Sequence, residues 1–215
     1  PFPKNYLDLS ENDQIEVLST LKGDIDINVF SDEMLVKTLG SIQAIKEIQY
    51  RNGKRGANRY IISNNQTALN VMQTFAMLNL SGFGEKLPVD VIPLFETVDD
   101  LQNASNVMKT LYTNTSYREH VSYRKDKQTI MLGFSDGTKD GGYLMANWSI
   151  FKAKEELTTI SREYGIDVIL FDGIYYELDN IKEPQWIGGQ PETWDKENNK
   201  FEDGSNQLID SPSYL

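Results

Sequence analysis

Residues 131–142 combine an apolar run with the charged groups that a binding site needs. The run, Met-Leu-Gly-Phe-Ser-Asp-Gly-Thr-Lys-Asp-Gly-Gly, stops at a glycine-spaced turn that carries Asp136, Lys139 and Asp140. A buried strand is predicted just before the turn, and a long helix is predicted after it. Ligands of parallel α/β proteins bind at the loops that follow strands. We therefore place a candidate site on this strand-to-helix loop.

Glu96 is a second candidate, because it ends another predicted strand much as Asp136 follows its own. In a parallel sheet, both carboxylates would lie at the edge where the strands end. Two carboxylate ligands suit a hard Mg²⁺ or Mn²⁺ ion, whose other octahedral positions are filled by water and by a substrate phosphate or carboxylate. Both acids also precede predicted helices, so they could instead stabilise helix N-termini. Spacing alone favours this second role.

The other polar groups of the turn could act on a substrate. Lys139 could hold an anion or stabilise developing negative charge, or it could be a solvated surface lysine. Ser135 could donate a hydrogen bond to a substrate oxygen, or it could cap the helix that follows. Asp140 completes the candidate catalytic set. His120, the only histidine, lies in a tyrosine-rich stretch that offers no acidic partner, so we predict a structural or surface role for it.

Composition excludes several function classes. A net charge of −11 and an isoelectric point near 4.6 argue against nucleic acid or an anionic membrane as the main partner, because clustered Lys and Arg bind phosphates. The absence of cysteine excludes disulfides and thiolate sites and fits a reducing cytosol. Neither a signal peptide nor an apolar span of about 20 residues is present. The chain starts at Pro1, so we expect that its true N-terminus has been removed.

Strand-like and helix-like segments alternate from residue 60 onward. Short apolar runs predict strands at residues 60–62, 89–95, 129–134 and 168–171. Helical spacing predicts helices at residues 10–21, from a Ser31 cap to Tyr50, from about 67 to 77, after the capping box of Thr97 and Asp100, and at about 143–164. This alternation predicts an α/β fold with parallel strands and helices that cover the sheet.

Four consecutive βα units could form half of a TIM-type (β/α)₈ barrel or a small open sheet, and length does not decide between them. We divide the chain into an N-terminal helical or linker segment at 1–30, the βα units at 31–173, and an irregular acidic tail at 174–215.

Four blocks, in order and at matching spacing, resemble the phosphoenolpyruvate carboxylase family. They are Pro93-Leu-Phe-Glu-Thr-Val-Asp-Asp-Leu-Gln-Asn-Ala104, Tyr117-Arg118, Leu132-Gly-Phe-Ser-Asp-Gly-Thr-Lys-Asp-Gly-Gly142 and Ile166-Asp-Val-Ile-Leu-Phe-Asp-Gly173. The resemblance covers roughly residues 30–173. It implies an α/β barrel with added helices, in subunits several times longer than this chain.

The resemblance also implies a function. Glu96 and Asp136 would hold Mg²⁺ or Mn²⁺, and Lys139 would lie near bicarbonate and phosphate. In the family, bicarbonate attacks the phosphate of phosphoenolpyruvate, and the CO₂ that is then released joins the enolate to give oxaloacetate. A divalent ion neutralises charge on the phosphate and the enolate oxygen. The resemblance therefore implies a cytoplasmic lyase of carbon dioxide fixation that replenishes the tricarboxylic acid cycle.

The chain departs from the family after its fourth strand. The family reads Phe-His-Gly-Arg-Gly-Gly there, whereas Asp172 stands at the histidine position and Ile174 at the arginine position. A further family histidine belongs to an N-terminal region that this sequence does not contain. We therefore predict that the chain alone does not carboxylate phosphoenolpyruvate. We also predict that it forms a homo-oligomer or associates with the remainder of the barrel, because half a barrel exposes strand edges.

A different functional class is compatible with the same residues. A non-catalytic interaction protein could retain the α/β scaffold, while the tail at 174–215 contacts a partner.

Overall fold

The computed structural model describes residues 3, 5–173, 194–195 and 200–201. The chain divides into two compact units, Pro1–Ile174 and Tyr175–Leu215. In the second unit, β5 (Trp194–Asp195) and β6 (Lys200–Phe201) form an antiparallel pair. The other residues of the predicted acidic tail, 174–215, lie outside the described part of the chain.

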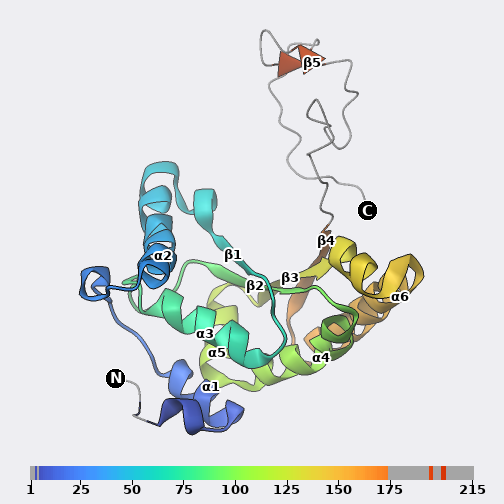
Figure 1. Cartoon of the computed structure of the whole chain (residues 1–215), viewed down its shortest axis with the longest axis horizontal. Helices are drawn as coiled ribbons and strands as arrows, with labels where there is room; N and C mark the ends of the chain where they lie inside the picture. Colours follow the sequence, from blue (N-terminus) through green and yellow to red (C-terminus); the bar gives the residue numbers. More distant parts are fainter. Residues whose placement is uncertain (1–2, 4, 174–193, 196–199, 202–215) are drawn as a thin grey trace. The chain divides into compact units, whose positions relative to one another are not determined.

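The first unit is built on a four-stranded parallel sheet. Its strands are β1 (Arg59–Ile62), β2 (Asp90–Phe95), β3 (Lys127–Gly133) and β4 (Asp167–Gly173), and they lie side by side in the order of the sequence (Figure 1). All three strand pairs are parallel. The predicted α/β fold with parallel strands is therefore confirmed. The carboxyl ends of the strands, where the candidate residues lie, meet at one edge.

Helices connect the strands and precede the first one. The connecting helices are α3 (Ala68–Asn79), α4 (Val98–Thr113), α5 (Thr115–Tyr123) and α6 (Phe134–Glu163). Before β1 lie α1 (Glu11–Ser19) and α2 (Glu33–Asn52), with short 3₁₀ turns η1 (Tyr6–Asp8), η2 (Ile27–Val29) and η3 (Lys54–Ala57). No helix in the described residues has the length and apolar character to cross a membrane.

Side-chain caps fix the starts of several helices, α2 and α4 among them. The Thr97 hydroxyl accepts the N–H of Asp100 at 3.1 Å, and the Asp100 carboxylate accepts the N–H of Thr97 at 3.0 Å, so the predicted capping box at α4 is confirmed. The predicted Ser31 cap is wrong by one residue. Asp32 caps α2 instead, because its carboxylate accepts the Leu35 N–H at 2.8 Å.

Helix α5 was not predicted from the sequence. Tyrosine, histidine, valine and serine, which make up most of it, are weak helix formers, so propensity gives little signal. Tertiary packing stabilises the helix instead. Tyr117, His120 and Val121 are buried on its inner face, and Asn114 caps it by accepting the Tyr117 N–H at 3.0 Å.

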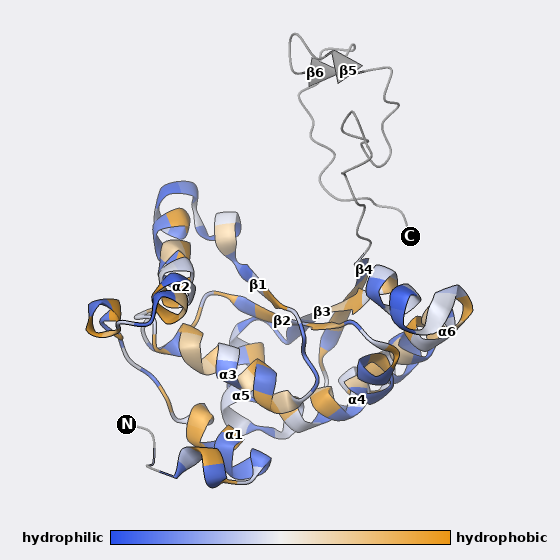
Figure 2. Ribbon diagram, in the orientation of Figure 1, coloured by the Kyte–Doolittle hydropathy of each residue, from blue (hydrophilic) through white to orange (hydrophobic). Residues whose placement is uncertain are grey.

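The main core lies between the helices and one face of the sheet. Val91, Phe95, Ile130 and Leu132 of the inner strands pack there with buried side chains of the helices, and Ile15 and Leu18 of α1 belong to the same core. Figure 2 shows hydrophobic segments along the helices and strands that meet there. Burial of this apolar area is the main force that holds the helices on the sheet.

On the opposite face of the sheet, only the side chains of the two inner strands, β2 and β3, are buried. Ile61, Ile92, Thr129 and Ile169 lie in one row across the four strands. The inner two are 0% and 7% exposed, whereas Ile61 and Ile169 on the outer strands are 47% and 41% exposed. Full coverage of the sheet was expected, and it holds for the inner strands only. An outer strand has a neighbour on one side, so its side chains keep more contact with solvent.

Candidate functional site

Glu96 directly follows β2, and its carboxylate reaches across to the end of β1. One carboxylate oxygen, Oε2, accepts the N–H of Asn64 at 3.2 Å. Asn64 has a left-handed backbone (φ 52°), which turns the chain after β1 and presents this N–H. The hydrogen bond fixes the direction of the Glu96 side chain at the carboxyl edge of the sheet.

Two glycines let the end of β3 approach Glu96 closely. A Cβ atom at Gly133 would lie 3.0 Å from the Cα of Glu96 and 3.1 Å from the carbonyl oxygen of Phe95. A Cβ at Gly137 would lie 3.5 Å from the Glu96 carbonyl oxygen. Only a residue without a side chain fits at Gly133 without movement of the backbone. The turn that carries Asp136 is therefore packed directly against Glu96.

The turn itself is helical, which corrects the predicted loop. Helix α6 begins at Phe134, immediately after β3, and it is interrupted only at Gly142 (φ 78°, ψ 166°). The predicted start near residue 143 corresponds to the second part of this kinked helix. Sequence reasoning missed the first part because its glycines at 137, 141 and 142 are poor helix formers. Ser135, Asp136, Lys139 and Asp140 thus lie on the first turns of a helix.

Asp136 and Lys139 lie near each other and remain accessible. Asp136 Oδ1 is 3.8 Å from Lys139 Nζ, and their side chains are 48% and 68% exposed. An ion pair of this length and exposure contributes little to stability. Ser135 is half-buried in the same turn.

Asp140 connects α6, the helix that carries the candidate site, to the neighbouring helix α4. Its Oδ2 accepts the N–H of Val98, the first residue of α4, at 2.9 Å. A carboxylate at a helix N-terminus satisfies a free N–H and interacts favourably with the helix dipole. This contact gives Asp140 a positioning role between α6 and the turn that follows Glu96.

The structure shows whether Glu96 and Asp136 act as helix caps, the alternative to metal binding. Thr97 and Asp100 cap α4, so Glu96 is not its capping residue. Asp136 does lie in the first turn of α6, where an acidic group is favourable, but the N-cap of that helix is Gly133, with no side-chain hydrogen bond. The structure thus gives Glu96 no capping function and leaves a dipole contribution for Asp136.

A hard divalent cation fits the chemistry of these donors. Mg²⁺ needs only one or two protein carboxylates when waters and a substrate anion complete its octahedron. Glu96 and Asp136 offer this number of oxygen donors. No group of three or more His, Cys, Asp or Glu side chains suitable for a metal occurs in the part of the chain that the structure describes. A fully protein-coordinated ion, such as structural Zn²⁺, does not fit these donors.

Comparison with known proteins assigns the family. A model of the phosphoenolpyruvate carboxylase family matches residues 2–174. The chain belongs to the phosphoenolpyruvate carboxylase family. The matched region begins at residue 2, whereas the sequence resemblance covers residues from about 30 onward.

Curated carboxylases are similar over the same part of the chain. The enzyme of Nitrosomonas europaea is 34% identical over 179 residues, which are 79% of this chain and 19% of the relative. The enzymes of Nitrosomonas eutropha and Corynebacterium diphtheriae are 35% and 33% identical, and cover 79% and 80% of this chain and 19% and 20% of their own lengths. This carboxylase-family chain therefore spans about a fifth of the length of these relatives.

Asp172, at the histidine position of the carboxylase family, forms an ion pair that sequence reasoning did not anticipate. Its Oδ2 lies 2.8 Å from Lys154 Nζ of α6, and the two side chains are 23% and 32% exposed. The other oxygen, Oδ1, is buried without a hydrogen-bond partner. The pair joins the end of β4 to α6. The spacing of 18 residues between a helix and a strand gives no signal in the sequence.

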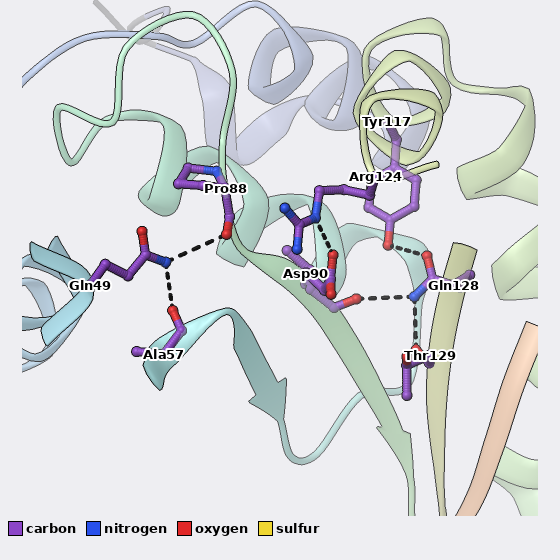
Figure 3. Close-up of polar contacts among 9 residues, drawn as sticks. Gln49, Ala57, Pro88, Asp90, Tyr117, Arg124, Gln128 and Thr129 are labelled. Carbon is purple, nitrogen blue, oxygen red and sulfur yellow. Dashed lines mark hydrogen bonds and ion pairs between the residues drawn. The ribbon is translucent and has the colours of Figure 1, made fainter. Parts of the chain in front are cut away.

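A polar network closes the opposite, amino-terminal edge of the carboxylase-like sheet (Figure 3). The Tyr117 hydroxyl donates to Gln128 Oε1 at 3.0 Å, and Gln128 Nε2 donates to the Val91 carbonyl oxygen at 3.0 Å. Arg124 pairs with Asp90. The first contact joins α5 to the start of β3, and the other two join β3 and the end of α5 to the start of β2, so this edge is built for stability.

His120 lies beside this network and is a structural residue. It is 8% exposed, and its ring packs against Phe75 with centroids 5.1 Å apart. Burial lowers the pKa of His120 from 6.5 to about 4, although Asp90 opposes this shift. The imidazole is therefore neutral at pH 7. Of the two roles predicted for His120, the structural role is confirmed. The surface role is wrong, because the ring on α5 points into the protein.

Proposed function

We propose that this chain is a segment of a phosphoenolpyruvate carboxylase and supplies the metal-binding part of the active site. Glu96 and Asp136 would hold Mg²⁺ or Mn²⁺, and Lys139 and Ser135 would contact the anionic substrates. The observation that carries the proposal is the packing of Gly133 and Gly137 against Glu96, at 3.0 and 3.5 Å for the added Cβ atoms, which brings the two carboxylate-bearing turns together. Family membership supports the same roles.

The proposed reaction joins bicarbonate to phosphoenolpyruvate. A bicarbonate oxygen attacks phosphorus, the bond from phosphorus to the enol oxygen breaks, and carboxyphosphate and the enolate of pyruvate form. Carboxyphosphate loses CO₂ to leave phosphate, and the enolate carbon then bonds to CO₂ to give oxaloacetate. A bound divalent ion would supply charge neutralisation at the phosphate and enolate oxygens.

The chain's own residues would orient the reactants. The Lys139 ammonium would hold an anionic oxygen of bicarbonate or phosphate, and its side-chain exposure of 68% supports this role. Ser135 would donate a hydrogen bond to the same substrate. Asp140 would act on neither reactant directly, because its carboxylate is engaged by Val98 and holds the turn in position.

Manganese binding tests the proposed ligands. Free Mn²⁺ has a paramagnetic resonance signal that falls when the ion binds, so titration of the purified chain gives a dissociation constant. We expect Glu96→Gln and Asp136→Asn each to weaken binding by at least about tenfold, since each removes one of two charged ligands. Asp99→Asn, an exposed acid on the first turn of α4, is the matched control. Equal affinity in all four proteins would contradict the proposal.

We also propose that the isolated chain does not form oxaloacetate. The Asp172 carboxylate stands where the family has a basic histidine, and its ion pair with Lys154 leaves no net positive charge there for a substrate anion. The arginine position, Ile174, lies outside the described residues. A coupled assay for oxaloacetate checks this expectation, and turnover by the purified chain above the level of a Glu96→Gln variant would overturn it.

The sheet is consistent with half of a TIM-type barrel. Four parallel strands in sequential order, helices on one face and a row of apolar side chains on the other are features of such barrels. In this proposal, Ile61, Ile92, Thr129 and Ile169 face the barrel interior, and further strands of the longer enzyme would cover the outer two. The segments 1–30, 31–173 and 174–215 remain our proposed division of the chain.

A non-catalytic interaction protein is the second candidate. A cluster of exposed apolar side chains on α6, at Leu144, Trp148 and Phe151, favours it, since such clusters mark contact surfaces. Wild-type chain that binds no Mn²⁺ in the titration would support this candidate over the first. The first candidate implies a cytoplasmic enzyme, and the net charge of −11 disfavours nucleic acid or an anionic membrane as partner.

A further inference from the structure

Helix α6 carries two apolar stripes, and only one of them is buried. Ala146, Ile150, Ala153 and Leu157 face inward and are at most 6% exposed. Leu144, Trp148 and Phe151, which we call the α6 stripe, recur at the spacing of one helix face on the other side. They are 82%, 59% and 59% exposed. A helix with apolar residues on both sides belongs in the interior of a larger structure.

The α6 stripe is larger than scattered surface residues would produce. Tyr143 and Met145 flank it with exposures of 69% and 44%, and the rings of Trp148 and Phe151 are in contact, with centroids 5.9 Å apart. Tyr143, Trp148 and Phe151 alone expose roughly 300–450 Å², taking full burial of an aromatic side chain as 150–250 Å². The largest apolar patch on a typical monomer is about 300–600 Å² and is often functional.

The charges beside the stripe are already paired. Lys152 lies 2.5 Å from Glu155, and Lys154 lies 2.8 Å from Asp172. A partner therefore gains little from charge on its own surface and must supply apolar side chains. At the start of α6, the ring of Phe134 meets Tyr143 edge to face at 6.0 Å, so the stripe continues into the turn that carries Asp136.

We infer that the α6 stripe is the docking surface for another part of a carboxylase polypeptide, which covers it with an apolar surface. This inference rests on the proposed function, that the chain is a carboxylase segment. The relatives have about four fifths of their length outside the region they share with this chain, which is ample polypeptide to cover it.

A second uncovered region favours a longer polypeptide over a second copy of this chain. Ile61 and Ile169 are exposed on the face of the sheet opposite the main core, whereas the α6 stripe points away from that core on the helix side. A two-fold contact between copies buries one self-complementary patch and leaves the other open. A longer chain can reach both regions.

The test compares one substitution in two settings. The first is the 215-residue chain, and the second is the Nitrosomonas europaea carboxylase with its matched region replaced by residues 2–174 of this chain. Leu144→Asp should leave the melting temperature of the 215-residue chain within about 2 °C, because Leu144 is 82% exposed there. In the chimaera it should lower the melting temperature by at least about 5 °C, because an aspartate would be buried among apolar groups.

Met34→Asp is the matched control, since Met34 is 79% exposed on α2. We expect it to have little effect in either setting. An equal loss from Met34→Asp, no loss from Leu144→Asp in the chimaera, or a chimaera that does not fold would overturn the inference. A dimer of the 215-residue chain that Leu144→Asp dissociates, as measured by light scattering, would assign the stripe to a second copy and would also overturn it.

Manganese binding separates this inference from the function on which it rests. A chimaera that is sensitive to Leu144→Asp but whose Mn²⁺ affinity is unchanged by Glu96→Gln and Asp136→Asn would retain the docking surface and refute the proposed ligands. Retained dependence on both ligands without sensitivity to Leu144→Asp would refute the docking surface alone.

Discussion

Asp140 accepts the backbone N–H of Val98 at 2.9 Å and thereby joins the helix that carries Asp136 to the turn that follows Glu96. The two residues are 42 positions apart in the sequence. Gly141 permits the contact, since a Cβ there would lie 2.7 Å from the Val98 side chain. Nearby, Gly133 lies against the Glu96 backbone. The turns that carry the candidate metal ligands are thus joined by the Asp140 carboxylate. They approach closely because the glycines between them have no side chain.

Removal of the Asp140 carboxylate should loosen this arrangement without removing a proposed ligand. We expect Asp140→Ala to lower the free energy of unfolding by about 1 kcal/mol, the usual cost of a lost helix cap. It should also weaken Mn²⁺ binding by less than Glu96→Gln does. Urea unfolding and Mn²⁺ titration measure the two effects. If Asp99→Ala, which removes an exposed acid at the start of α4, has the same effects, then the contact of Asp140 with Val98 is not responsible.

A side chain at Gly133 should separate the two carboxylates. We expect Gly133→Ala to lower the free energy of unfolding by about 1–3 kcal/mol, because the new Cβ would lie 3.0 Å from backbone atoms that cannot rotate away. Mn²⁺ affinity should fall with it. Chemical denaturation and metal titration of the purified variant would measure both losses.

Gly40 provides the matched control for that substitution. It lies inside α2 with no atom within 4 Å of an added Cβ, so Gly40→Ala should stabilise the chain by about 0.5–1 kcal/mol. Similar losses at Gly40 and Gly133 would contradict the explanation by close approach.

His120 should make the protein less stable in mild acid. Its pKa is lowered from 6.5 in the unfolded chain to about 4 in the folded chain, chiefly by burial. Between these values the unfolded state binds the additional proton, so the free energy of unfolding falls as pH drops from 6.5 toward 4. The loss attributable to this group approaches about 3 kcal/mol at the lower limit.

A substitution without a titrating ring isolates the His120 contribution. His120→Phe should reduce the dependence of unfolding free energy on pH between about 4.5 and 6.5, while stability near pH 7 reflects packing alone. Urea titrations at several pH values measure the slope for both proteins. Parallel slopes for wild type and His120→Phe would show that other groups cause the acid sensitivity.

The pair of Lys154 and Asp172 should be coupled. We expect Lys154→Met to cost about 1–3 kcal/mol of unfolding free energy, since it leaves a mostly buried carboxylate without its cation. Asp172→Leu in the same chain should recover much of this loss. A double-mutant cycle measures the coupling, and the exposed pair of Lys37 and Glu33 should give a value near zero by the same method. Equal coupling in both pairs would refute the importance of burial.

The sequence alone predicted the elements that carry the candidate site. Apolar runs marked all four strands within about two residues, and the capping box of Thr97 and Asp100 marked the start of α4. These features are local, because strand patterns and caps depend on residues within a few positions of one another. The ordered blocks around Glu96, Asp136 and Lys139 carried the family resemblance, which the family match then confirmed.

Only the tertiary structure decided how these elements meet. In the folded chain, the predicted loop at Asp136 is a helix, and His120 is buried on a helix that propensity does not indicate. Lys154 pairs with Asp172. Leu144, Trp148 and Phe151 are exposed on a helix whose other side is buried. Each outcome depends on contacts between residues far apart in the chain, whose energies come from packing and desolvation rather than from local preference. For that reason, the spacing of Glu96 and Asp136 indicated their chemistry, whereas the glycines that bring their backbones together were evident only in the folded chain.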